Sequence, residues 1–428
     1  MKSLKSLFVT AAAAGIAGCG GSSGGNDVAT PDGCSIAGQN AFVLSTMEDI
    51  YLWNTEIPGD VDPEAFDSPG DLLEAIRFRP IDRFSFLTTL ASENALLGNS
   101  QFAGFGFRSR RDGDVQIVSE VFEDSPADLG GLVRGARITA IDGRPMAEIF
   151  AAEGFSAALG PPEPGLTRTL AFSLPDGTEL EATIAKDVVT IWPVSGLRVF
   201  EVNGVPTGYM NFRTFTEPAA PALSAAADEL LAASVSQLVL DVRYNGGGLL
   251  SIAEFLAGLV GGQAAAGQVF VTNQYNEQNA FRNDSRLFRN PDNGLDLARI
   301  VFITTPATAS ASEILINGLA PFVEVSVVGD TTFGKPVGQL GFAFCEQVLR
   351  PASFQTVNAN GDGDFFAGIA PDCPAGDDLS RPLGDPEEAS LAEALHLLET
   401  GSCSAPAPPV RAKPGGESPV GYRWLDAD

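Results

Sequence analysis

The sequence predicts an α/β protein, because short β-branched and aromatic runs alternate with segments of helical spacing over its C-terminal half. Such alternation is typical of strand–helix–strand units and of a mainly parallel sheet. The segments expected to be strands or helices in this half lie at 208–212, 219–233, 237–242, 249–260, 269–272, 301–304 and 323–328, with one more helix that starts at Ser310. A helical region (36–99) and a β-rich region (100–188) precede it. A chain of 428 residues can hold two or three such domains.

Two stretches of the N-terminal region have helical spacing. Apolar and aromatic side chains recur through 41–55, and a second helical stretch covers 63–77 before a more extended one at 79–90. Aromatic stripes at this spacing are usually core. We therefore assign no chemistry to this region.

The composition is that of an acidic globular protein, with 44% hydrophobic residues and a formal net charge of −28. This charge argues against nucleic acid as a partner. The chain has no G-K-[ST] or G-x-G-x-x-G pattern and no zinc-ligand spacing, so we expect no cofactor and no metal. The run 358–364 resembles the first half of a calcium loop, but Ile369 stands where such a loop needs Glu, which favours a polar turn.

The first residues have the pattern of an export signal. Lys2 and Lys5 precede an apolar run at 7–17 that is too short to span a bilayer. Small residues then lead to Cys19, and this arrangement resembles the lipobox of bacterial lipoproteins. The resemblance implies cleavage before Cys19, lipidation of its thiol and amine, and a lipid anchor in the cell envelope. Because Gly20 follows rather than Asp, we expect the outer membrane, facing the periplasm; an ordinary signal peptide with an incidental cysteine is the alternative.

A serine stands at the expected start of a helix, shortly after the 301–304 strand. Ser310 and Glu313 form the S-x-x-E pattern of a helix start. The first N–H groups of a helix lack partners within the helix and attract negative charge. The Ala311 N–H could therefore stabilise an oxyanion formed when Ser310 attacks a carbonyl group. The plainer interpretation is a serine that only caps the helix.

A lysine in an uncharged setting could supply the base that a serine nucleophile needs. After the N-terminal segment the chain holds only Lys186, Lys335 and Lys413, and no charged residue lies within four positions of Lys335. Burial lowers the pKa of a lysine from about 10.4, which would let it accept a proton near neutrality. The single histidine, His396, lies in a helical segment rich in Leu and Glu, so a Ser-His-Asp arrangement would depend wholly on that residue.

These motifs together resemble the C-terminal processing (tail-specific) peptidase family. The match consists of the ASASE segment around Ser310, the TFGK segment that ends at Lys335, 25 positions later, and Gln339 four positions after the lysine. The resemblance implies that Ser310 is the nucleophile, Lys335 the general base and Gln339 the residue that orients the lysine. Ser312 is the competing nucleophile within the motif. Pro336 departs from the glycine that the family often has, and it removes a backbone donor.

A glycine-rich turn follows the apolar 237–242 strand. In α/β sheets, ligands bind beyond the carboxyl ends of the strands, and glycines let the backbone approach a ligand closely. The turn resembles the family's D-x-R-x-N-x-G-G segment, whose glycine amide joins the oxyanion hole, and the resemblance gives that role to Gly246 or Gly247. Asp241 and Arg243 are expected to be structural and to form an ion pair.

The β-rich region resembles a PDZ domain. A GFGF segment, formed by Gly104, Phe105, Gly106 and Phe107, opens it, and an SPA turn and an IDG segment follow in PDZ order. The resemblance implies that this loop captures the C-terminal carboxylate of a protein while the peptide adds a strand to the sheet edge. Ala136 stands where the family usually has an acidic residue, and a plain β-hairpin is the alternative for GFGF alone.

Four cysteines remain after Cys19, and an even number in an exported protein suggests disulfides. Three pairings are possible. We favour Cys345–Cys373, which would close a hairpin-like segment, together with Cys34–Cys403, which would join the two ends of the folded part.

The sequence thus favours a serine endopeptidase of the cell envelope that recognises and cleaves proteins near their C-termini. The resemblance implies a crotonase-like βαβ superhelix for the catalytic domain, with the PDZ-like domain inserted in it or preceding it. The expected parts are a signal peptide (1–18), a Gly/Ser tether (19–35), a helical N-terminal domain (36–99), a PDZ-like domain (100–188), a Ser-Lys peptidase domain (189–402) and a flexible tail (403–428). An inactive PDZ-type scaffold is the alternative, and acyl transfer involving a small molecule such as a thioester is a third interpretation.

Overall fold

The computed structural model describes residues 29–289 and 291–404. The predicted signal peptide, the predicted lipidation site at Cys19, and most of the predicted tether and tail lie outside the described residues. Within the described ranges, no helix is long and apolar enough to cross a membrane.

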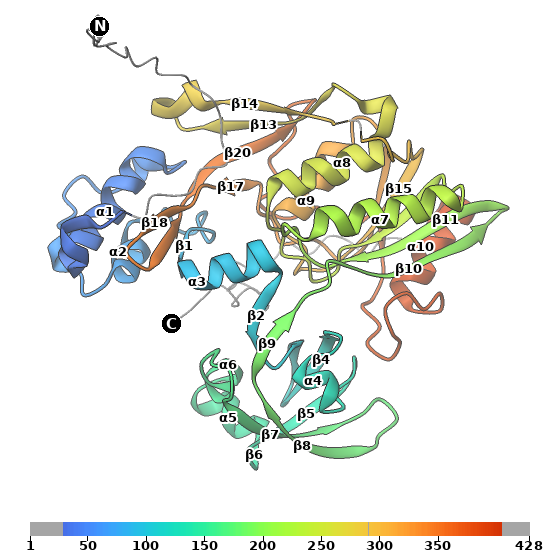
Figure 1. Ribbon diagram of the computed structural model, residues 1–428, viewed down its shortest axis with the longest axis horizontal. Helices are drawn as coiled ribbons and strands as arrows, with labels where there is room; N and C mark the ends of the chain where they lie inside the picture. The colour runs from blue at the N-terminus through green and yellow to red at the C-terminus, as the bar shows by residue number, and fades with distance from the viewer. Residues whose placement is uncertain (1–28, 290, 405–428) are drawn as a thin grey trace, which may run out of the picture.

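A six-stranded sheet forms the centre of the larger part of the molecule (Figure 1). In spatial order its strands are β10 (Val194–Val202), β11 (Val205–Phe212), β12 (Gln237–Asp241), β15 (Arg299–Thr304), β16 (Glu324–Gly329) and β21 (Cys373–Pro374). The strands from β11 to β21 are parallel, and β10 pairs antiparallel with β11. The predicted α/β class is confirmed.

Helices cover both faces of this sheet. They are α7 (Ala219–Ala232), α8 (Leu250–Ala265), α9 (Ala311–Leu319) and α10 (Ala389–Thr400). Successive side chains of a strand point to opposite faces. Leu238 and Leu240 of β12 therefore share a core with α7, α8 and α9, whereas Val239 packs in a second core with α10.

Two antiparallel sheets lie beside the central one. The first contains β14 (Asp284–Leu287), β13 (Val269–Tyr275), β20 (Ala352–Asn358) and β17 (Val337–Gln339), and the second contains β1 (Phe86–Thr89), β19 (Gln347–Arg350) and β18 (Phe342–Phe344). The strand predicted at 269–272 therefore exists as β13 but does not join the parallel sheet. β13 pairs with β14 and β20, and the strand beside β12 is β15. The alternation of strands and helices along the sequence does not show which strands pair, because pairing depends on contacts between distant parts of the chain.

The N-terminal region is helical, as predicted. Its helical segments are η1 (Pro31–Cys34), α1 (Ile36–Ile50), η2 (Asn54–Glu56), η3 (Pro63–Ala65), α2 (Pro69–Ile76), α3 (Leu90–Glu93) and η4 (Asn94–Gly98), and η5 (Glu277–Arg282) follows later in the chain. Ser35 and Ser68 cap the first N–H groups of α1 and α2 with their hydroxyls. Met47 of α1 shares one hydrophobic core with Phe333 and Val337, so this region packs directly against the segment that carries Lys335.

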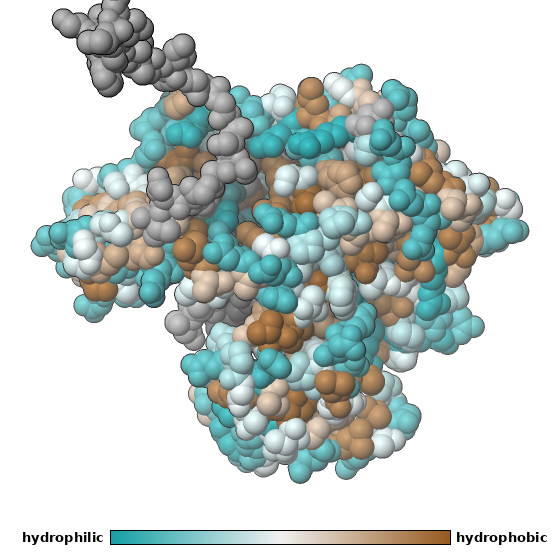
Figure 2. All heavy atoms as spheres, viewed as in Figure 1, coloured by the Kyte–Doolittle hydropathy of each residue, from teal (hydrophilic) through white to brown (hydrophobic). Residues whose placement is uncertain are grey.

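The β-rich region forms a separate lobe. The chain enters it through β2 (Gln101–Gly104) and leaves it through β9 (Asp187–Thr190), and these two strands pair antiparallel. We call residues 105–186 the β lobe; its elements are β3 (Phe107–Asp112), β4 (Val115–Val121), α4 (Pro126–Leu129), β5 (Arg137–Ile141), β6 (Arg144–Pro145), α5 (Met146–Ala152), α6 (Phe155–Leu159), β7 (Thr167–Ser173) and β8 (Glu179–Ala185). Figures 1 and 2 show it as a distinct mass below the rest of the molecule. Its assignment as a PDZ domain stays a prediction.

Both ends of the described chain fold against the body, which corrects two predicted boundaries. Residues 29–35 are not tether, because Ala29 bridges Phe344 and its carbonyl accepts a hydrogen bond from the Cys345 N–H at 2.7 Å. The predicted tail does not begin at 403, because the Ser404 N–H donates to the Glu393 carboxylate at 2.9 Å.

The disulfides pair differently from the prediction. The structure joins Cys34 to Cys345 and Cys373 to Cys403, with Cα–Cα distances of 5.9 and 5.3 Å. The predicted pairing, Cys345–Cys373 with Cys34–Cys403, is therefore wrong. Cys345 lies in the turn between β18 and β19, beside the N-terminal segment, whereas Cys373 belongs to β21 at the edge of the central sheet, against the end of α10.

Candidate active site

Ser310 lies in the turn between β15 and α9, at the carboxyl end of the central parallel strands. Its backbone angles are φ 55° and ψ −118°, a region that residues other than glycine rarely adopt. Such strained positions gather at functional sites, and a strained strand-to-helix turn exposes a nucleophile at the top of a sheet. The strain at Ser310 thus goes beyond what a simple capping serine needs.

The carboxylate of Glu313 links the start of α9 to the lysine segment. Its Oε2 atom accepts hydrogen bonds from the N–H groups of Ser310 at 2.9 Å and Lys335 at 2.8 Å. Its Oε1 atom accepts the Gly334 N–H at 2.6 Å and the Thr332 hydroxyl at 2.5 Å. Full burial raises the pKa of Glu313, and these four donors act in the opposite direction. One buried side chain therefore sets where the serine and lysine backbones lie relative to each other.

Lys335 and Gln339 are in direct contact. Lys335 Nζ donates to Gln339 Oε1 at 2.5 Å, and Gln339 Nε2 donates to the backbone carbonyls of Phe84 at 2.7 Å and Arg350 at 2.8 Å. Burial, followed by the nearby charge of Arg350, lowers the pKa of Lys335 to about 8. No hydrogen bond joins Lys335 Nζ to Ser310 Oγ among the described residues; such bonds are often long before substrate binds.

The two alternative residues of the sequence analysis lie in other settings. The Ser312 hydroxyl is buried and donates to the Asn245 carbonyl at 3.0 Å, so it supports the backbone of the glycine turn. His396 lies on α10, where its Nε2 atom is 3.5 Å from the Thr400 hydroxyl.

The glycine turn after β12 packs tightly against Ser310. A Cβ atom on Gly247 would lie 2.9 Å from the Ser310 Cβ and 2.9 Å from the Ala311 N. The Gly247 N–H is engaged by the Asn245 side chain at 2.9 Å. The Gly246 and Ala311 N–H groups have no hydrogen-bond partner within the described ranges. This geometry favours Gly246 over Gly247 as the oxyanion donor from the turn, with Gly247 required for close approach.

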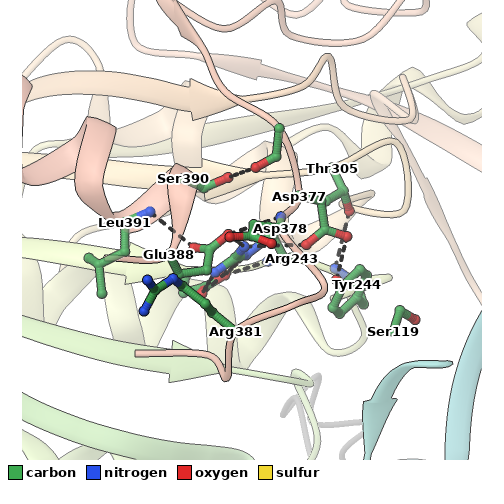
Figure 3. A network of polar contacts seen from close by, with 12 residues as sticks. Ser119, Arg243, Tyr244, Thr305, Asp377, Asp378, Arg381, Glu388, Ser390 and Leu391 are labelled. Carbon is green, nitrogen blue, oxygen red and sulfur yellow. Dashed lines mark hydrogen bonds and ion pairs between the residues drawn. The ribbon is translucent and has the colours of Figure 1, made fainter. Parts of the chain in front are cut away.

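A buried ionic network supports this turn (Figure 3). Arg243 has a fully buried side chain and contacts Asp241 at 2.7 Å and Glu388 at 2.9 Å. The predicted Asp241–Arg243 ion pair is present. Glu388 and its neighbour in the network, Asp377, had no signal in the sequence, because they lie over 130 positions beyond Arg243.

Tyr244, in the same turn, connects the turn to the β lobe. It also has a positive φ, of 62°. The Tyr244 hydroxyl donates to Asp377 at 2.6 Å and accepts from Arg134 of the β lobe at 2.6 Å. Arg134 also pairs with Asp377 at 2.6 Å, and Arg108 of the β lobe donates to the Tyr244 carbonyl. Burial raises the pKa of Asp377, but Arg134 and then Arg243 hold it below its usual value.

The predicted peptide-binding residues lie where β2 passes into the β lobe. Gly104 ends β2, Phe105 is buried in the core of the lobe, and Phe107 begins β3. Gly106 is packed against Ser125, whose Cβ a side chain at position 106 would meet at 2.1 Å. The role of this loop in peptide capture stays a prediction.

A single group of potential metal ligands occurs within residues 29–289 and 291–404, and it consists of Cys373, Glu393 and Cys403. Its two cysteines form a disulfide and cannot act as thiolate ligands.

A strained serine at a helix start, a lysine of lowered pKa and a glycine turn are the features of a serine-nucleophile site on an α/β fold. Comparison with known families points to a peptidase. Residues 206–375 match the model of peptidase family S41, and residues 38–86 match the S41 N-terminal domain. The chain belongs to peptidase family S41.

Individual relatives are similar over part of their length. The carboxy-terminal processing protease CtpB of Bacillus subtilis is 31% identical over 286 residues, which cover 64% of this chain and 55% of the relative. A carboxyl-terminal-processing protease of Picosynechococcus is 28% identical, with 55% of each chain covered. The chain thus spans about half the length of the curated relatives it matches.

Solved structures share the fold. A structure of Bacteroides fragilis assigned to the S41 proteases has a TM-score of 0.70 at 24% identity and covers 84% of this chain and 97% of its own. The photosystem II D1 C-terminal processing protease has a TM-score of 0.52 at 20% identity and covers 82% and 98%.

Proposed function

We propose that this chain is a serine endopeptidase that cleaves proteins near their C-termini. Ser310 is the nucleophile, Lys335 the general base, and Gln339 the residue that orients the lysine. The observation that carries the proposal is the convergence of the Ser310 and Lys335 backbones on Glu313, with Lys335 Nζ donating to the Gln339 amide oxygen. The similarity to carboxy-terminal processing proteases supports the substrate class.

The geometry suggests the following sequence of steps. Neutral Lys335 takes the hydroxyl proton as Ser310 Oγ attacks the peptide carbonyl. The Ala311 and Gly246 N–H groups stabilise the resulting oxyanion. Protonated Lys335 then passes the proton to the leaving amine, and water hydrolyses the acyl-enzyme by the reverse route.

The GFGF loop of the β lobe is proposed to capture the substrate's C-terminal carboxylate. Lipidation at Cys19 and a periplasm-facing location in the cell envelope complete the proposal. They rest on the sequence pattern before Cys19 and are tested by labelling cells with a fatty acid, comparing wild type with Cys19→Ala and fractionating the membranes.

Proteolysis by the purified chain tests the activity. We expect wild type to cleave an unfolded substrate with an apolar C-terminus, and Ser310→Ala and Lys335→Ala to lose this cleavage. Ser45→Ala is the matched control, because Ser45 is exposed on α1, its hydroxyl donates to the Phe42 carbonyl at 3.1 Å, and its loss should leave cleavage intact. Cleavage that survives Ser310→Ala would contradict the proposal, and so would binding of the tail peptide without cleavage by wild type.

A further inference from the structure

An ion pair lies beside the proposed general base. Gln339 receives Lys335 on its amide oxygen, and its amide nitrogen donates to the carbonyls of Phe84 and Arg350. The Arg350 guanidinium also donates to the Gln339 carbonyl at 3.4 Å. Arg350 therefore contacts the orienting glutamine through both its backbone and its side chain, and its positive charge acts on the lysine.

The partner of this arginine comes from the N-terminal region. Glu93, at the end of α3, pairs with Arg350 through two contacts, from Nε at 2.8 Å and from Nη2 at 2.6 Å. The Arg350 side chain is only 21% exposed and the Glu93 side chain only 13%. Their mutual field is therefore less screened by water than that of a surface pair. The start of α3 is anchored to the turn between β18 and β19, the strand that carries Arg350, because the Leu90 N–H donates to the Glu346 carbonyl at 2.9 Å.

Lys335 itself has no ion-pair partner within the described residues. The charged groups that act on it are Arg350 from β19, Asp82 from the segment before β1, and Glu313 from α9. Asp82 already accepts three hydrogen bonds from other groups, and Glu313 accepts four. Arg83 contacts backbone carbonyls of the lysine segment. The Asp82 and Glu313 carboxylates are thus engaged by other donors, and Arg350 is the cation that acts on the lysine.

We propose that Arg350 is a positioning residue that favours the neutral, proton-accepting form of Lys335, and that Glu93 limits this effect by neutralising part of the guanidinium charge. The inference rests on the proposed function, because it assigns a purpose to the neutral lysine. A cation disfavours a second cation nearby, whereas an ion pair that only braced the fold would have no effect on the lysine's protonation.

Charge variants of the pair test the proposal through the pH dependence of kcat/KM for the full chain. Wild type should gain activity as pH rises through about 8, the pKa of Lys335. Arg350→Gln leaves an unpaired carboxylate and should move this rise upward by about 0.5–1 pH unit, so that kcat/KM at pH 7 falls about 3–10-fold and recovers at high pH. Glu93→Gln leaves an unpaired cation and should move the rise downward.

Two further variants separate charge from structure. Arg350→Lys keeps the positive charge and should titrate close to wild type, even if its rate is lower at every pH. The double variant, Arg350→Gln with Glu93→Gln, should lie between wild type and Arg350→Gln. Profiles that fall by a constant factor without a shift, or shifts in the same direction for both single variants, would overturn the inference.

Direct titration keeps this test independent of catalysis. The chain has five lysines, so the Lys335 Nζ resonance can be assigned by its loss in Lys335→Arg and followed with pH by NMR. If Lys335→Ala remains active, the proposed function fails, yet a changed Lys335 titration in Arg350→Gln would still support the electrostatic coupling. An unchanged titration in an active enzyme would reject the coupling alone.

Discussion

The two loops that flank Ser310 are held in opposite ways. The glycine turn after β12 rests on a dense network of paired charges, which includes Arg243 and Tyr244 and extends into the β lobe. The lysine segment rests on hydrogen bonds to the Glu313 carboxylate, on the Gln339 amide and on apolar packing against the N-terminal helices, and no carboxylate among the described residues forms an ion pair with the Lys335 side chain.

This difference matches what each loop must do. A turn that supplies oxyanion donors works best when rigid, and satisfied buried ion pairs hold a unique geometry. A base must lose its charge, so carboxylates that would pair with the lysine are engaged elsewhere. We infer that ion pairs position the glycine turn, whereas the neutral form of Lys335 is favoured because the carboxylates near its ammonium are engaged by other donors.

The largest expected effect is on folding and comes from the charge-paired side. Arg243→Met leaves Asp241 and Glu388 buried without their cation, and breaking a buried pair in this way costs about 3–5 kcal/mol. Urea unfolding measures the loss. Arg299→Met is the matched control, because its partner Glu324 is 61% exposed and little change is expected. Equal losses in both variants would contradict the special status of this network.

The next effect is on the rate and separates close approach from backbone strain. Gly247→Ala places a methyl group 2.9 Å from atoms of Ser310 and Ala311, which displaces the nucleophile from the oxyanion donors. We expect kcat to fall about 10²–10³-fold, as for the loss of one donor. Gly113→Ala is the control, since Gly113 also has a positive φ but open space around it. A full kcat in Gly247→Ala would show that the turn is not in register with the serine.

Much of the central sheet and the chemistry of Ser310 could be predicted, because these signals are local in the chain. Hydrophobic alternation located β12, β15 and α9, and the scarcity of lysine singled out Lys335. The S-x-x-E pattern identified Glu313 only as a capping residue. That its carboxylate also holds the lysine segment depends on a contact across 22 positions.

The contacts that could not be predicted all join distant parts of the chain. Arg134 and Asp377 both contact the Tyr244 hydroxyl, although 243 positions separate them in the chain. The support of Gln339 comes from the Phe84 carbonyl, a backbone atom that no residue pattern records. Disulfide pairing failed for the same reason, because proximity in sequence does not show which strands and termini come together.

A smaller effect should appear on the lysine side and in the direction of greater stability. The pKa of Lys335 is lowered from 10.5 to about 8 in the folded chain, so between these values the unfolded chain binds a proton that the folded chain does not. Wild-type stability should therefore rise with pH across this window. Lys335→Met removes the cost and should be more stable at pH 7 by about 1–3 kcal/mol, with the gain vanishing toward pH 10.5. A constant gain in urea unfolding at all pH values would contradict the depressed pKa.

The smallest effect tests whether the β lobe contributes to the rigidity of the glycine turn. Tyr244→Phe removes the hydroxyl that joins Asp377 and Arg134, but Arg134 keeps its direct pair with Asp377. We therefore expect kcat to fall only about 3–10-fold, the equivalent of one or two hydrogen bonds, with KM for a short peptide unchanged. Tyr275→Phe, on β13, is the matched control and should keep wild-type kcat. If Tyr244→Phe also keeps it, the ionic pairs beneath the turn suffice to hold the oxyanion donors, and contact with the β lobe adds nothing to the chemical step.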